Sequence, residues 1–309
     1  MVRPRPLHDG ARVAVVSPAG PVVPDILEAG LDLLRDWGVE VELDESVYSN
    51  AEDRGYLAGE DAVRVRAVQH ALDDDDIDAI IFSRGGYGTM RILPELDFTR
   101  FRQNPKLLVG FSDLTALHLY VAGKLDIPTL HAPVVKSMRM HQEGTPSFEA
   151  LRNALFGKRE RPFVIDGLDT IRNGRVSGRL LGGNMTLLVH MLASPLCPDL
   201  SDAILLLEDV GEEDYRLDRM FTALRLSEKA RRPAGLLLGD FTDCGGAFVD
   251  DPRIDDFVSS LAAELDVPAV ADFPCGHGDR NLAVPMGTDV RLDATEGRIE
   301  FLDDATSTN

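Results

Sequence analysis

The sequence has few cysteines and no long apolar run. Its three cysteines, Cys197, Cys244 and Cys275, are widely spaced and odd in number, which argues against a disulfide framework and against a metal-binding motif. Such usage is typical of a reducing compartment, so we expect a cytoplasmic protein. No run of about 18 apolar residues occurs, so we expect no transmembrane helix and no membrane partner. The apolar run at 11–19 is interrupted by Pro18 and predicts a first strand rather than a signal peptide.

Positive charge is also scarce. Lys and Arg total 32 against 52 Asp and Glu, which gives a formal net charge of −20. The phosphates of a nucleic acid would be repelled by such a chain, so we expect no nucleic acid partner. The 309 residues, 44% of them hydrophobic, are enough for two domains with separate cores.

The first part of the chain alternates between strand and helix patterns. Strands are predicted at 12–17, 39–43 and 77–82, and helical periodicity occupies 24–37 and 58–72 between them. This alternation predicts an α/β fold built on a parallel, doubly wound sheet.

The periodic pattern weakens in the middle of the chain. We place a linker at 141–173, between an N-terminal domain at 1–140 and a C-terminal domain at 174–309. The C-terminal part mixes strands and helices and ends in a predicted hairpin.

A serine follows the predicted strand at 107–109. The sequence there is Gly-Phe-Ser-Asp at 110–113, and helical spacing begins at Leu114. A serine on a sharp strand-to-helix turn exposes its hydroxyl, and the N–H of the next residue, Asp113, suits a developing oxyanion. Ser112 is therefore a candidate nucleophile. The alternative is that Ser112 only caps a helix, since the fifth position of the usual elbow motif is not glycine here.

A second loop, Ser-Arg-Gly-Gly-Tyr-Gly at 83–88, follows the strand at 77–82. Its glycines let the backbone approach a ligand closely. The loop matches neither a dinucleotide fingerprint nor a phosphate loop. We interpret the N–H of Gly86 as an oxyanion donor that faces Ser112, with a merely tight turn as the alternative.

A histidine and an acid complete a possible catalytic set. His131 and His277 both lie in loops after strands, and His277 has a glycine on each side, which leaves its ring free to be aimed. Glu208 ends a predicted buried strand at 203–207, where a carboxylate could orient a histidine or simply be solvated. Ser112, Glu208 and His277 together suggest a serine hydrolase.

Five short motifs, which together span nearly the whole chain, carry a resemblance to a known family. They lie at 83–88, 109–113, at 178–184 (Gly-Arg-Leu-Leu-Gly-Gly-Asn), at 207–212 (Leu-Glu-Asp-Val-Gly-Glu) and at 276–281 (Gly-His-Gly-Asp-Arg-Asn). In this order they resemble the LD-carboxypeptidase family, serine peptidases that include muramoyltetrapeptide carboxypeptidases and the microcin C immunity peptidases.

The resemblance implies a flavodoxin-like N-terminal domain, a smaller, barrel-like C-terminal domain, a site at their junction and a homodimer. It implies that Ser112 is the nucleophile, His277 the general base and Glu208 its orienting acid. The N–H groups of Gly86 and Asp113 would form the oxyanion hole. Neither a metal nor a cofactor is implied.

The activity implied is release of the terminal D-alanine from muropeptide tetrapeptides during cell-wall recycling. Arg84 and Arg280 lie in the candidate loops, where either could hold the substrate carboxylate or neutralise acidic surface. The alternative is a microcin-type peptidase that cleaves peptidyl or aminoacyl nucleotides. The loop at 83–88 differs from the one expected there, and the single tryptophan, Trp37, lies on a predicted helix rather than near a site.

Overall fold

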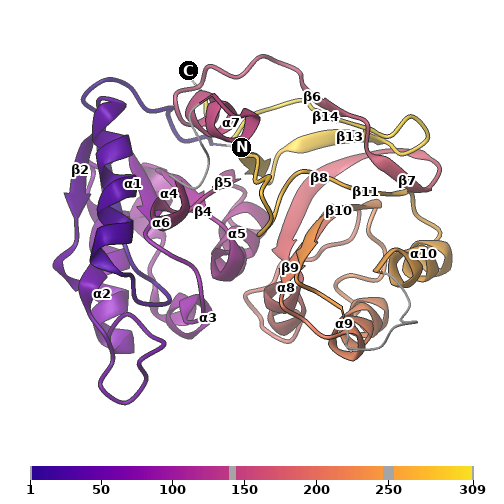
Figure 1. The fold of residues 1–309 in the computed structure, drawn as a ribbon, viewed down its shortest axis with the longest axis horizontal. Coiled ribbons are helices and arrows are strands. Elements are labelled where there is room, and N and C mark those ends of the chain that lie inside the picture. The colour runs from indigo at the N-terminus through magenta and orange to yellow at the C-terminus, as the bar shows by residue number, and fades with distance from the viewer. Residues whose placement is uncertain (1, 139–143, 246–253, 308–309) are drawn as a thin grey trace.

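The computed structural model describes residues 2–138, 144–245 and 254–307. Two sheets lie side by side in it, the first built mainly from the N-terminal part of the chain and the second from the C-terminal part (Figure 1). No helix in the described part of the chain is long and apolar enough to cross a membrane.

Within the described residues the first sheet has six strands, in the order β12-β5-β4-β3-β1-β2. Neighbouring strands from β1 to β5 are parallel, and β12 pairs antiparallel with β5. The order 2-1-3-4-5 is that of flavodoxin-like folds. The strands are β1 (Arg12–Val16), β2 (Glu40–Leu43), β3 (Ala79–Phe82), β4 (Leu107–Gly110), β5 (Thr129–His131) and β12 (Val284–Met286).

Helices cover both faces of this sheet. One face packs against α1 (Pro24–Asp36), α6 (Val135–Met138) and α7 (Pro146–Leu155). The other packs against α2 (Asp61–Asp73), α3 (Thr89–Ile92), α4 (Thr99–Gln103) and α5 (Thr115–His118). The core on this second face continues into the second sheet, so the two sheets share a hydrophobic cluster.

The predicted α/β class is confirmed, and the predicted elements of the first part are observed with shifted ends. The helix predicted at 58–72 is α2, which begins three residues later. Gly59 has a φ of +88°, a left-handed conformation that ends the preceding turn before the helix can start.

The second sheet is curled into a half-barrel, in the order β6-β14-β13-β8-β9-β10-β11-β7. The strands from β8 to β11 are parallel, and the outer ones are antiparallel. The strands are β6 (Phe163–Asp166), β7 (Asp169–Arg172), β8 (Arg175–Asn184), β9 (Ile204–Val210), β10 (Gly235–Thr242), β11 (Ala269–Ala271), β13 (Asp289–Asp293) and β14 (Arg298–Phe301). The predicted C-terminal hairpin is formed by β13 and β14.

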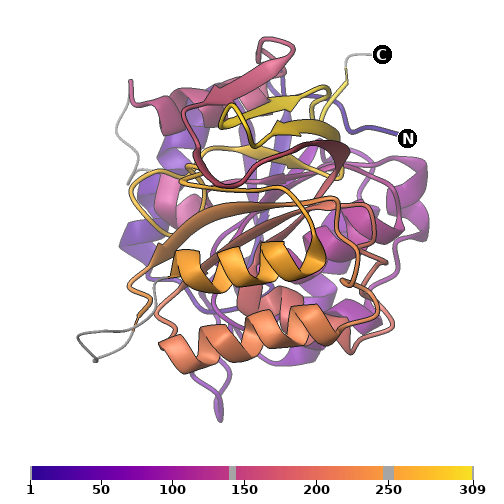
Figure 2. The same ribbon diagram turned by 90° about the vertical axis from the view of Figure 1, so that its right-hand side faces the viewer.

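Three helices accompany the parallel strands: α8 (Met185–Leu192), α9 (Asp214–Leu226) and α10 (Ile254–Leu265). Figure 2 shows α9 and α10 in front of the strands, on the side of the sheet that faces away from the first sheet. The range in which we placed a linker, 141–173, contains α7, β6 and β7, and its first three residues lie outside the described ones.

Candidate active site

Ser112 lies on a strained turn immediately after β4. Its φ is 65°, a left-handed value that a residue with a side chain rarely adopts. A Cβ at Gly110 would lie 2.9 Å from the Leu114 side chain, so only glycine fits where the turn begins. Such strain persists only where the surrounding structure enforces it, which is typical of functional sites.

The helix predicted after Ser112 is irregular. A 3₁₀ turn at Ser112–Leu114 leads into α5, and a π-helical turn follows at Leu119–Lys124. Turns of the π type occur often near functional sites, and simple apolar periodicity does not reveal them.

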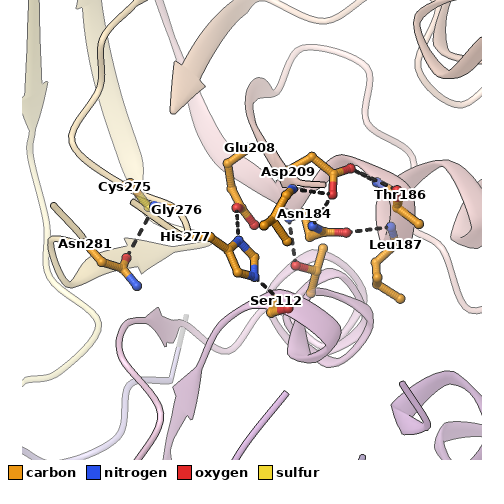
Figure 3. A network of polar contacts seen from close by, with 12 residues as sticks. Ser112, Asn184, Thr186, Leu187, Glu208, Asp209, Cys275, Gly276, His277 and Asn281 are labelled. Atoms are coloured by element: carbon orange, nitrogen blue, oxygen red, sulfur yellow. Dashed lines mark hydrogen bonds and ion pairs between the residues drawn. The ribbon is translucent and has the colours of Figure 1, made fainter. Parts of the chain in front are cut away.

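His277 and Glu208 reach Ser112 from the second sheet (Figure 3). The Nε2 atom of His277 lies 3.0 Å from the Ser112 hydroxyl oxygen, and Nδ1 lies 2.7 Å from a carboxylate oxygen of Glu208. An ionised carboxylate only accepts, so Nδ1 carries the proton and Nε2 is free to accept from the serine hydroxyl. This arrangement is the one that base-assisted nucleophilic attack requires.

Burial shapes the charge of this set. The side chain of Glu208 has no exposed surface, whereas that of His277 is 17% exposed. Burial lowers the pKa of His277, and the charge of Lys136 acts in the same direction. The hydrogen bond and negative charge of Glu208 outweigh both, so the pKa of His277 is raised. The solvated carboxylate considered as an alternative for Glu208 is therefore not what the structure contains.

The other histidine that we considered, His131, is fully buried at the end of β5. Its Nδ1 atom lies 3.3 Å from the sulfur of Cys275. Burial holds the pKa of His131 well below its usual value. It therefore stays neutral, and its ring contacts Cys275 rather than Ser112.

The glycine loop at 83–88 lies directly against the nucleophile. A Cβ at Gly85 would lie 3.0 Å from Cβ of Ser112, and Gly86 has a φ of +110°. The buried carboxylate of Asp113 accepts a hydrogen bond from the N–H of Thr89 at 2.8 Å, which ties the end of the loop to the serine turn. The two segments that were predicted to supply oxyanion donors are thus neighbours.

Arg64 is a residue that our sequence reasoning missed. Its guanidinium is fully buried and donates to the carbonyl oxygens of Pro18, Gly59 and Gly88. Its hydrogen bond to Gly88 therefore helps to fix the end of the glycine loop. One signal for it was available: position 64 belongs to the buried stripe 64, 67, 68 and 71 of α2, where an apolar residue would be expected.

A polar network supports the strand end that carries Glu208 (Figure 3). Asp209 accepts hydrogen bonds from the Asn184 amide at 2.8 Å and from the N–H and hydroxyl of Thr186 at 2.9 Å. The N–H of Asn184 donates to the Thr115 hydroxyl on α5 at 2.9 Å. This network joins β8 and β9 to the helix that follows Ser112.

The two arginines that we predicted as substrate ligands have partners within the protein. Arg280 forms ion pairs with Asp272 and, at 3.8 Å, with Asp240. Arg84 donates to the carbonyl oxygen of Pro21 at 2.6 Å. Arg280 lines the cavity beside His277, and Arg84 is not among the residues that line it.

That cavity has a volume of about 750 Å³ and is walled by Phe111, Lys136, Ser147, His277 and Asn281, among others. Its size suits a small peptide or nucleotide. Among the described residues, no group of three His, Cys, Asp or Glu side chains is arranged to hold a metal ion.

Comparison with known proteins gives a consistent result. Residues 13–132 match the N-terminal domain of the LD-carboxypeptidase family, and residues 177–292 match its C-terminal domain. The murein tetrapeptide carboxypeptidase of Pseudomonas aeruginosa is 34% identical over 299 residues, which cover 93% of this chain and 94% of that protein.

Solved structures agree with this match. The muramoyltetrapeptide carboxypeptidase of Oxalobacter formigenes is 26% identical with a TM-score of 0.83, over 96% of this chain and 100% of that one. MccF in complex with glutamyl sulfamoyl guanosine has a TM-score of 0.88 at 20% identity, over 99% and 100% of the two chains, a likeness of fold alone. Because both halves of the sequence and the whole fold match, this chain belongs to the LD-carboxypeptidase family.

Proposed function

We propose that the protein is a serine carboxypeptidase whose catalytic residues are Ser112, His277 and Glu208. The observation that carries the proposal is the continuous hydrogen-bonded path from Ser112 through His277 to Glu208. Its members come from positions 165 and 69 residues apart in the chain. Family membership supports a serine-type peptidase independently of this geometry.

In the proposed mechanism, His277 removes the proton of the Ser112 hydroxyl while the serine oxygen attacks the scissile carbonyl carbon. The N–H groups of Gly86 and Asp113 donate hydrogen bonds to the oxyanion that forms. Removal of one such donor costs about 10² to 10³ in kcat in serine proteases. His277 then protonates the leaving amine, and a water molecule, activated by the same histidine, hydrolyses the acyl-enzyme.

The proposed substrate is a muropeptide tetrapeptide, cleaved at the amide between an L-centred residue and the terminal D-alanine. Support comes from the names of the relatives, since the Pseudomonas aeruginosa and Oxalobacter formigenes proteins are described as murein or muramoyl tetrapeptide carboxypeptidases. The cavity beside His277 is large enough for such a peptide end.

We further propose that the protein acts in the cytoplasm as a homodimer with two domains per chain, at 1–140 and 174–309. The location is supported by the cysteines, all three of which are free thiols. Sedimentation equilibrium would test the dimer, since a monomer mass would overturn it.

The function is tested by release of D-alanine from L-Ala-γ-D-Glu-meso-diaminopimelyl-D-Ala. We expect release by the wild type, and a fall in kcat of roughly 10⁶ in Ser112→Ala, as for other triad serines. Release that is unchanged in Ser112→Ala would contradict the nucleophile. Cleavage of an aminoacyl sulfamoyl nucleotide instead of the peptide would favour the microcin-type activity.

Trp37 packs edge-on against Phe148 and Phe156 and is not among the residues that line the cavity. Its ring is therefore not placed to stack on a nucleotide base there.

A further inference from the structure

One cation that lines the cavity has no carboxylate partner among the described residues. Lys136 belongs to α6, and its N–H donates to the carbonyl oxygen of Ser83 at 3.1 Å, which places it beside the glycine loop. Its side chain is partly buried and lines the cavity together with His277. Among the described residues, no hydrogen bond or ion pair to its ammonium group is found.

Arg280, which lines the same cavity, pairs with Asp272 and Asp240, whereas no described carboxylate pairs with Lys136. A partly buried charge without a partner is costly unless something else compensates it. Burial lowers the pKa of Lys136, and the positive charge of the nearby Arg84 lowers it further. Both effects would be relieved by an anion bound in the cavity.

The chemistry of the proposed reaction supplies such an anion at this place. In a carboxypeptidase substrate, only three covalent bonds separate the scissile carbonyl carbon from the terminal carboxyl carbon. The leaving amine receives its proton from His277, so the leaving residue must lie on the side of Ser112 where His277 and the cavity are. Lys136 lines the same cavity as His277, and its positive charge acts to lower the pKa of that imidazole.

We propose that Lys136 binds the terminal carboxylate of the leaving D-amino acid and thereby restricts the enzyme to chain ends. This inference rests on the proposed carboxypeptidase function. The ammonium would compensate the carboxylate as it leaves bulk water, and an internal peptide bond would leave the ammonium unpaired and be cleaved poorly. Arg280 is less suited, because two carboxylates already neutralise it. The guanidinium of Arg84 is directed at Pro21, outside the cavity lining.

The test compares two substrates that differ only in this charge: the tetrapeptide with a free terminal D-alanine and the same peptide ending in D-alaninamide. The readout is the ratio of kcat/KM for the acid to kcat/KM for the amide. We expect a large ratio in the wild type and a fall of about 10²-fold in Lys136→Met, as when one partner of a buried charge pair is removed. Lys136→Arg keeps the charge and should retain most of the preference.

Two further variants make the result specific. Lys124→Met removes one positive charge from an exposed lysine outside the cavity and should leave the ratio unchanged. Arg280→Met tests the rival cation, and collapse of the ratio there rather than in Lys136→Met would overturn the proposal. Thermal melting would show whether the Lys136→Met enzyme is folded. A folded variant that keeps the full preference for the acid over the amide would also overturn the proposal for Lys136, while leaving the carboxypeptidase function intact. A wild type that releases nothing from either peptide would overturn both.

Discussion

The first sheet supplies the nucleophile and the backbone that holds it, whereas the second supplies the side chains that activate it. At the end of β4 and in the loop after β3, the chemistry depends on a left-handed serine and on glycines that allow close approach. At the end of β9 and in the loop after β11, it depends on a buried carboxylate and an imidazole. We therefore expect the serine turn and the glycine loop to be sensitive to added atoms. The pair of Glu208 and His277 should instead be sensitive to a change of charge or protonation.

Apart from loss of the nucleophile itself, the largest effect should come from the activating side chains of the second sheet. Glu208→Gln keeps the shape of the residue but replaces a carboxylate that only accepts with an amide that can donate to the imidazole. His277 would then be stabilised less well as an imidazolium and held in the wrong tautomer. We expect kcat to fall by about 10⁴, the size of the matching change in a serine protease triad. Steady-state kinetics on the tetrapeptide checks this, and near wild-type kcat would show that Glu208 does not orient the base.

The next largest effect should come from the glycine loop after β3 in the first sheet. In Gly85→Ala the new methyl group would lie 3.0 Å from Cβ and 3.3 Å from Oγ of Ser112, so the nucleophile must shift. Small displacements of a reacting group can cost about 10² in rate. Gly55→Ala is the matched control, because a Cβ there meets nothing within 4 Å. Equal kcat in the two variants would mean that the glycine loop does not constrain Ser112.

A smaller effect is expected from the network that joins the two halves. Asp209→Ala leaves the Asn184 amide and the Thr186 N–H without their buried acceptor. Unpaired buried groups cost about 1 to 3 kcal/mol each, so the free energy of unfolding should fall by a few kcal/mol. Urea denaturation measures this loss. Asp199→Ala, at an exposed carboxylate, is the control, and an equal loss there would show that the network adds no particular stability.

The smallest effect that we predict is a shift in the pH dependence of kcat/KM. His277 must be neutral to accept the serine proton, and its pKa is raised by Glu208 against the effect of burial. Activity should therefore be lost with falling pH at a value above the usual histidine pKa of about 6.5. In Glu208→Gln the largest influences that raise the pKa of His277 are removed and only the weaker effect of Asp209 opposes burial, so this acid limb should move to lower pH. Profiles of kcat/KM against pH for the wild type and for Glu208→Gln measure the shift. Acid limbs at the same pH in both enzymes would show that Glu208 does not influence the titration of His277.

The accuracy of prediction from sequence differed between local features and features that depend on distant contacts. Local patterns were enough for β1 to β4 and for the strand-to-helix position of Ser112, because periodicity and glycine placement are local signals. They were not enough for Lys136 or for the network around Asp209, whose roles arise from contacts between segments far apart in the chain. From the sequence alone, Glu208 could either orient a histidine or be solvated. The sequence does not decide between the two, because burial of a carboxylate depends on which loop covers it. The pattern of single residues suggested Ser112, Glu208 and His277 as one set, and the motifs of the family implied the role of each.

The pairing of β12 with β5 has a consequence for how the protein is made. Residues 284–286 complete the sheet that carries the nucleophile, although they are synthesised long after β5 at 129–131. Until they emerge, β5 is an open edge next to β4, and such edges pair readily with other chains. The nascent chain therefore holds Ser112 without a finished sheet and without a base in place. Catalytic competence therefore requires that synthesis has passed both His277 and β12, and a chain that stops before them would be inert.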